Sequence, residues 1–161
     1  MLGSWAALDP GLDVGAYEVT ARISRIGLHI ARHQERAFGQ FGLNRGDVGV
    51  LSALRIAGPP NQLSPTRLFK GLMLSSAGIT NRLDRLEKRG LVRRTRDPGD
   101  RRGVLVQLTD EGSAVLEQAV RANTVAERDL INSLDVSDRE TLADLLKKLL
   151  SGLEAQSEED L

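Results

Sequence analysis

Residues Gly90–Gly112 read GLVRRTRDPGDRRGVLVQLTDEG, and the fold of the chain follows from this stretch. Residues 92–96 predict a first short strand. Over residues 104–108, apolar side chains alternate with their neighbours as in a half-buried second strand. Between the two, residues 97–100 read DPGD, and the Pro-Gly pair marks a turn. The stretch therefore predicts a two-stranded hairpin.

The predicted hairpin is rich in arginine. Its first arm and its tip carry five guanidinium groups, on Arg93, Arg94, Arg96, Arg101 and Arg102. Guanidinium groups suit phosphates and the narrow minor groove of DNA. Because the hairpin directly follows a short helix that ends at Gly90, it resembles the wing of a winged helix.

Apolar periodicity, helix caps and glycine or proline stops predict six helices around this hairpin. Four precede it: one over residues 14–41, one from Asn44 to the stop at Gly58, one starting at Ser64-Pro65, and one from Ser75 or Ser76 to Gly90. Two follow it: one capped by Thr109, and one that starts near Ser137 and carries leucines at helical spacing up to Leu153. The predicted fold class is mainly α with a small β-hairpin.

The third and fourth predicted helices form a helix-turn-helix, whose second helix lies in the major groove of DNA with its N-terminal residues at base edges. Asn81 can pair bidentately with adenine and Arg82 with guanine, whereas Arg85 lies further along, where phosphates are expected. The alternative is an ordinary charged helix surface, but the arginine-rich hairpin beside it favours a DNA reader. The predicted DNA-binding residues are Ser64, Thr66, Arg67, Ser75, Ser76, Gly78, Thr80, Asn81, Arg82, Arg85, Arg96, Asp100, Arg101 and Arg102.

Charge is segregated along the chain, although its net value is zero. Residues 64–103 hold 11 Lys/Arg and 4 Asp/Glu, whereas residues 109–161 hold 5 and 13. A basic segment of this kind attracts a polyanion, and acidic flanks limit indiscriminate binding. The alternative function is a winged helix that docks a protein and never touches DNA. Such a surface should be aromatic and apolar, but the chain is 3% aromatic.

Composition excludes several classes of function. Without cysteine there is no disulfide or thiolate metal site, and no glycine-rich phosphate loop or nucleophile pattern predicts an enzyme or a cofactor. His29 and His33 have a spacing that could chelate a metal, but no third ligand is evident, so we favour two polar surface histidines. We expect a cytoplasmic protein, associated with the bacterial nucleoid when bound to DNA and not with a membrane.

The terminal helices predict a homodimer. They are too apolar to stand alone, and the last one carries a leucine stripe wide enough for a helix-bundle seam, although part of that stripe must pack within the chain. High-affinity DNA sites usually come from symmetric pairs of readers. We therefore expect the partners to be double-stranded DNA and a second copy of the chain.

Together, the helix-turn-helix, the DPGDRR wing tip at residues 97–102 and the flanking helices resemble the MarR family of transcriptional regulators. The resemblance implies one domain over residues 1–161, with dimerisation helices at 14–41 and 112–153 and a winged helix-turn-helix DNA-binding lobe at 44–108. It also implies a repressor that a small-molecule effector releases from a pseudo-palindrome. In the wing, Asp100 would orient an arginine while Arg101 or Arg102 enters the minor groove.

A narrower resemblance is to the urate-responsive branch of that family, through Trp5, residues 9–13, residues 22–25 and residues 76–82. Matched residue by residue, the branch's pocket tryptophan falls on Trp5 and its wing-base arginine on Arg94. Its second-helix acid falls on Gly49, and its helix-one histidine falls near Gly27, two residues from His29. We therefore expect a small anionic aromatic ligand other than urate. The predicted ligand-binding residues are Trp5, Arg22, His29 and Arg94.

Overall fold

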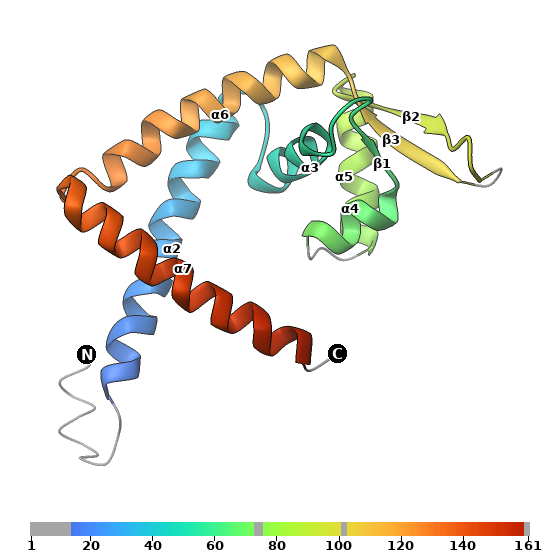
Figure 1. Cartoon of the computed structure of the whole chain (residues 1–161). Helices are drawn as coiled ribbons and strands as arrows, with labels where there is room; N and C mark the ends of the chain where they lie inside the picture. The colour runs from blue at the N-terminus through green and yellow to red at the C-terminus, as the bar shows by residue number, and fades with distance from the viewer. Residues whose placement is uncertain (1–13, 73–75, 101–102, 160–161) are drawn as a thin grey trace. The chain divides into compact units, whose positions relative to one another are not determined.

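The computed structural model of the chain describes residues 14–72, 76–100 and 103–159. The elements are α2 (Val14–Gly39), α3 (Arg45–Ile56), β1 (Gln62–Leu63), α4 (Pro65–Leu72), α5 (Ser76–Lys88), β2 (Val92–Arg96), β3 (Val104–Leu108), α6 (Asp110–Leu130) and α7 (Val136–Glu159) (Figure 1). The chain divides into two compact units at residue 126. The first holds α2 to most of α6, and the second holds the end of α6 and α7.

Three of these helices begin directly after a residue that the sequence predicted as a cap. Asn44 precedes α3 and forms a capping box with Asp47, in which each side chain accepts a hydrogen bond from the other residue's backbone N–H. The Ser64 hydroxyl accepts from the backbone N–H of Arg67 at the start of α4. Thr109 accepts from the N–H of Gly112 in α6 and donates to the carbonyl of Gly90. The last helix begins one residue earlier than predicted, because Asp135 caps it.

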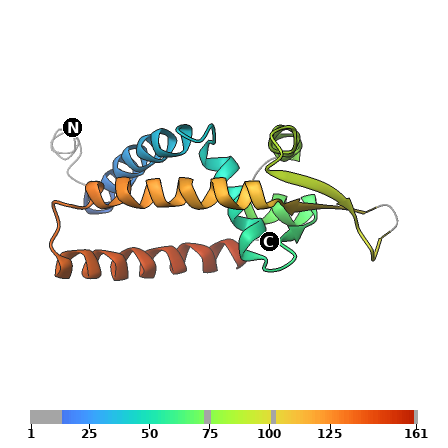
Figure 2. The ribbon, with the colours of Figure 1, turned by 90° about the horizontal axis from the view of Figure 1, so that it is seen from above.

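The two predicted strands have the bounds of β2 and β3, but the sheet contains a third strand that the sequence did not indicate. The strand order in the sheet is β1-β3-β2, and both neighbouring pairs of strands are antiparallel. Gln62 and Leu63 of β1 pair with Gln107 and Val106 of β3. β1 therefore anchors the base of β3 to the loop after α3, while the β2–β3 hairpin extends beyond α4 and α5 (Figure 2).

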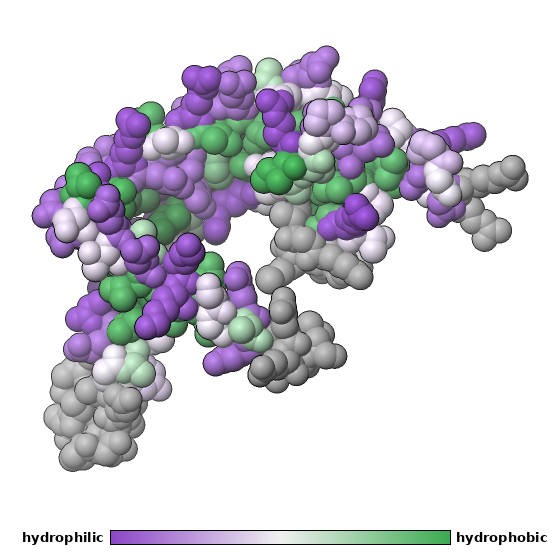
Figure 3. All heavy atoms as spheres, viewed as in Figure 1, coloured by the Kyte–Doolittle hydropathy of each residue, from purple (hydrophilic) through white to green (hydrophobic). Residues whose placement is uncertain are grey.

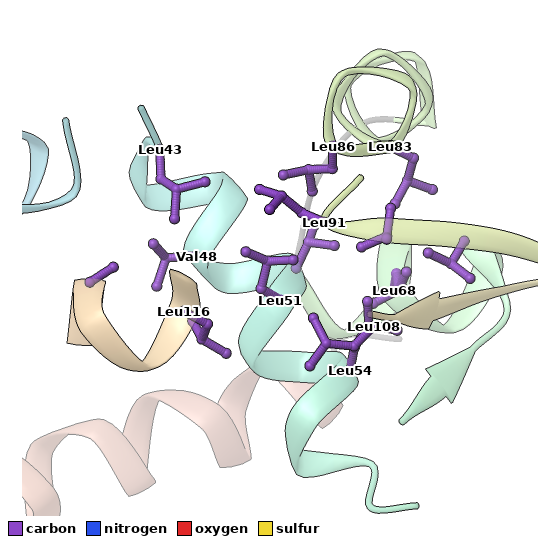
Figure 4. Packing of buried hydrophobic residues seen from close by; sticks show 14 of the residues in the cluster. Leu43, Val48, Leu51, Leu54, Leu68, Leu83, Leu86, Leu91, Leu108 and Leu116 are labelled. Atoms are coloured by element: carbon purple, nitrogen blue, oxygen red, sulfur yellow. The ribbon is translucent and has the colours of Figure 1, made fainter. Parts of the chain in front are cut away.

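The core of the first unit joins α3, α4, α5, the strand bases and the start of α6. Leucines from these elements point toward one another in Figure 4, among them Leu51 of α3 and Leu86 of α5. α6 comes close to the strands at Gly112, where an added Cβ would lie 2.0 Å from the carbonyl oxygen of Leu91. The turn before β2 needs Gly90, whose φ is +73° and whose N–H bonds to the Glu87 carbonyl.

The apolar stripes of α2 and α7 are exposed in the single chain. The α2 helix ends at Gly39, two residues before the predicted end, and buries Ala37 and Phe38 near that end. The large apolar side chains that remain exposed on α2 and α7 are Tyr17, Val19, Ile23, Ile26, Leu28, Val136, Leu142, Leu145, Leu146, Leu149, Leu150 and Leu153. Figure 3 shows apolar side chains among charged ones on these helices. No helix that the structure describes is long and apolar enough to cross a membrane.

Candidate nucleic-acid interface

α4 and α5 form the predicted helix-turn-helix. The buried side of α5 is set by Ile79, Leu83 and Leu86. On the opposite side, Asn81 and Lys88 are exposed, and Thr80 is exposed at its edge. In α4, Ser64 acts as the cap, and Thr66 and Arg67 are exposed beside it.

One flank of α5 is basic and contacts the start of α3. Nη1 of Arg82 donates to Oδ1 of Asn44 at 2.6 Å and to Oδ1 of Asp47 at 3.2 Å. Arg85 donates to the same oxygen of Asp47. Further along, Arg89 donates to the carbonyls of the turn after α2. The Arg82 guanidinium, predicted to read guanine, is therefore turned toward α3.

The other flank of α5 is acidic and contacts the base of the hairpin. Arg94 of β2 donates to Oδ1 of Asp84 at 2.5 Å and to Oε2 of Glu87, whose second oxygen accepts from the Arg94 backbone N–H at 3.0 Å. The hydrogen bond to Asp84 raises the pKa of the Arg94 guanidinium above its usual value; burial opposes this shift, and the charge of Glu87 adds to it. Arg94 thus connects the hairpin to α5, and both of its Nη atoms donate to carboxylates of that helix.

The hairpin itself is closed by backbone and side-chain hydrogen bonds. The N–H of Asp97 donates to the Gly103 carbonyl at 3.0 Å, and the Asp97 carboxylate accepts from the N–H of Gly99 at 2.8 Å. Arg96 and Asp100 are exposed near the tip. The remaining predicted tip residues, Arg101 and Arg102, lie outside the described residues, as do Ser75, Trp5 and the side chain of Ser76.

Of the predicted ligand-binding residues that the structure describes, Arg22, His29 and Arg94 line neither of two clefts beside α3 in the first unit. Arg22 is exposed on α2 and pairs with Glu18 one turn away, and His29 is also exposed on that helix. One cleft of about 390 Å³ is lined by Gln34, Phe38, Arg45, Gly46, Val48, Gly49 and Ser52. The second, about 340 Å³, is lined by Ser52, Arg55, Ile56, Ser113, Leu116, Glu117, Val120 and Arg121.

Sequence reasoning missed the contact between α3 and α5. Asp47 is 1% exposed, and it is the acceptor for two arginines that follow it by more than 30 residues. The spacing of Asn44 and Asp47 does match a capping box, which could have placed Asp47 at the helix start. In the part of the chain that is described, no group of three or more His, Asp or Glu residues could hold a metal ion.

A helix-turn-helix followed by a hairpin that is tied to its second helix defines a winged-helix DNA-binding domain. A sequence model of the MarR family matches residues 41–103. The chain is 35% identical over 145 residues to the HTH-type transcriptional regulator PecS of Dickeya dadantii (strain 3937), covering 90% of this chain and 87% of PecS. It is 31% identical over 144 residues to the HTH-type transcriptional repressor NicR of Pseudomonas putida (strain KT2440), covering 86% and 89%.

The structural comparison agrees with the sequence comparison. The crystal structure of a MarR mutant from E. coli in complex with operator DNA matches with a TM-score of 0.71 and 30% identity, covering 83% of this chain and 94% of that one. The chain belongs to the MarR family. It is a DNA-binding transcriptional regulator and not an enzyme.

Proposed function

We propose that the chain is a homodimeric repressor that binds a pseudo-palindromic operator and is released by a small anionic aromatic ligand. The observation that carries the proposal is the outward face of α5. Asn81 is exposed there, between one flank that is paired with α3 and another that is paired with the hairpin. A helix held on both sides presents its outer face to a groove without further ordering, and a pre-ordered reader loses less entropy on binding.

Base reading by Asn81 is tested with DNA that the wild-type protein selects from a randomised pool. Asn81→Ala removes an amide that can pair bidentately with adenine, a contact that contributes about 1–3 kcal/mol of discrimination. We expect preference to relax at one base position in each half-site, while preference at the others remains. Gln118→Ala is the matched control, because Gln118 is an exposed amide on α6. A uniform loss across all sequences after Asn81→Ala would contradict base reading.

The dimer is supported by the apolar faces that the single chain leaves exposed. The α7 leucines lie on one side of that helix, and burying such a stripe against a symmetric copy is favourable by about 25 cal/mol per Å² of apolar surface. Leu149→Glu should therefore shift the protein toward monomer in sedimentation velocity. Ser151→Glu places the same charge on the opposite side of α7 and should leave the mass unchanged. Equal effects of the two variants would contradict the proposed seam.

The ligand site is proposed in the cleft between α2 and α3, where Phe38 offers an apolar ring and Arg45 a positive charge. The volume of about 390 Å³ is within the range of small-molecule sites. Gly49 also lines this cleft. Because glycine has no side chain, no carboxylate projects into the cleft at this position, and an aromatic acid has room there. The resemblance to the urate-responsive branch stays a prediction from the sequence, and Trp5 stays a predicted contact.

Ligand release is tested by adding urate or benzoate to the protein–operator complex and following fluorescence anisotropy. Benzoate should lower operator affinity, and operator should lower benzoate affinity by the same factor. Arg45→Ala should abolish the response while leaving operator binding intact, whereas Arg36→Ala, an exposed arginine on α2, should not change it. A benzoate response that survives Arg45→Ala would place the ligand elsewhere.

The proposed function also concerns where the protein is found in the cell. Protein that is bound to DNA would co-sediment with the bacterial nucleoid.

A further inference from the structure

One buried carboxylate faces two arginines of α5. Asp47 is 1% exposed, whereas the side chains of Arg82 and Arg85 are 19% and 50% exposed. Oδ1 of Asp47 accepts from both guanidinium groups, and Oδ2 accepts from the backbone N–H of Asn44 at 3.0 Å. A buried charge is stable when it is paired and its remaining lone pairs are hydrogen-bonded, and Asp47 meets both conditions.

The backbone of α3 has a space for the guanidinium of Arg82. A Cβ built on Gly46 would lie 2.2 Å from Nη1 and 2.3 Å from Cζ of Arg82. The Arg82 guanidinium therefore occupies the space that the Cβ of any other residue at position 46 would fill. Nε of Arg82 is also buried, and it has no hydrogen-bond partner among the described residues. The fit over Gly46 is independent of the charge on Asp47, and both hold Arg82 in the same place.

We propose that Asp47 is a positioning residue that withholds Arg82 from DNA, so that base reading falls to Asn81 and its exposed neighbours. The proposal rests on the proposed function, because it concerns how α5 reads an operator. Arginine paired with guanine is the most common specific contact in the major groove. Arginine also pairs with any phosphate, so a released Arg82 would add affinity that does not depend on sequence. By pairing Arg82 within the lobe, Asp47 keeps the sequence-independent part of DNA affinity low.

Neutralising Asp47 should expose this role. In Asp47→Asn the two guanidinium groups face an amide, which leaves them without a compensating charge, and Arg82 turns toward solvent and phosphates. Each additional ion pair with a phosphate steepens the slope of log K against log salt by about 0.9, so a dimer with one more such pair per subunit has a slope steeper by about 2. The affinities for selected and scrambled DNA should rise by a similar factor, because the added phosphate contact is common to all sequences, so their ratio should stay close to the wild-type value.

Three further variants separate this role from a structural one. Arg82→Gln alone should change neither the salt slope nor the base preference, because Arg82 does not touch DNA in the wild-type protein. Asp47→Asn combined with Arg82→Gln should remove the part of the steeper slope that Arg82 contributes, about 0.9 per subunit. Gly46→Ala leaves Asp47 intact but displaces Arg82, so it should steepen the slope as Asp47→Asn does. It also keeps the proposal testable if Asp47→Asn does not fold.

The experiment selects DNA from a randomised pool with the full-length wild-type protein and then measures salt-dependent anisotropy for every variant. A steeper slope in Asp47→Asn and Gly46→Ala, removed by Arg82→Gln, is the expected result. Loss of preference at one base position in Arg82→Gln alone would overturn the proposal, as would wild-type slopes in both Asp47→Asn and Gly46→Ala. A pool from which the wild-type protein selects no sequence would overturn the proposed function as well.

Discussion

Replacing Gly112 by alanine tests the contact that joins α6 to the strands. The added Cβ would lie 2.0 Å from the carbonyl oxygen of Leu91 and 3.0 Å from Cδ1 of Leu108. The nearest obstacle is backbone, and the same carbonyl accepts from the N–H of Thr109 at 3.2 Å. The substitution therefore cannot be absorbed by a side-chain rotation, and α6 has to shift away from the sheet.

The size of the effect follows from two opposing contributions. Overpacking of a close contact costs about 1–3 kcal/mol, and the position of this clash favours the upper end. Alanine regains about 1 kcal/mol through its helix propensity. The free energy of unfolding of Gly112→Ala should therefore fall by about 2 kcal/mol.

The assay is urea unfolding followed by circular dichroism at one fixed protein concentration, because the stability of a dimer depends on concentration. Gly39→Ala is the matched control, since a Cβ there would meet nothing within 4 Å. This control should be neutral or slightly stabilising. A Gly112→Ala protein as stable as wild type would refute the close packing of α6 on the strand base.

Three other perturbations address the caps and ion pairs of the first unit. Asn44→Ala removes the α3 cap and an Arg82 acceptor and should lower the free energy of unfolding by about 1–2 kcal/mol in urea, whereas Asn44→Ser should retain most of it. Arg94→Gln removes the ion pairs between the hairpin and α5. It should weaken binding to every DNA sequence several-fold in anisotropy and leave base preference unchanged. Loss of the ligand response with intact DNA binding would instead favour a ligand-binding role for Arg94. The hydrogen bond from Arg121 lowers the pKa of Glu117, so Arg121→Gln should raise this pKa toward 4.5 in an NMR titration, and an unchanged pKa would contradict the pair.

The hairpin and the helix order could be predicted from the sequence because their signals are local. Alternation over residues 104–108 and the caps at Asn44 and Thr109 depend on neighbours within a few positions. The strand β1 could not be predicted in this way. Its two residues have no periodicity, and they become a strand because β3, more than 40 residues later, supplies the pairing partners.

The candidate site was predicted in outline, but the direction of its side chains was not. The spacing of α5 identifies its buried side, and that prediction agrees with the core. Whether Arg82 faces a groove or the lobe depends on Asp47 and on the missing Cβ at Gly46, which lie in another helix. The same holds for Arg94, whose two carboxylate partners are on α5.

The central claim is that a symmetric dimer places two copies of α5 in successive major grooves. Hydroxyl-radical and methylation footprinting on the selected DNA tests it most directly. The account predicts two equivalent protected half-sites about 10 base pairs apart, related by two-fold symmetry, with minor-groove protection on their outer sides from the wings. One asymmetric half-site at saturating protein would contradict it.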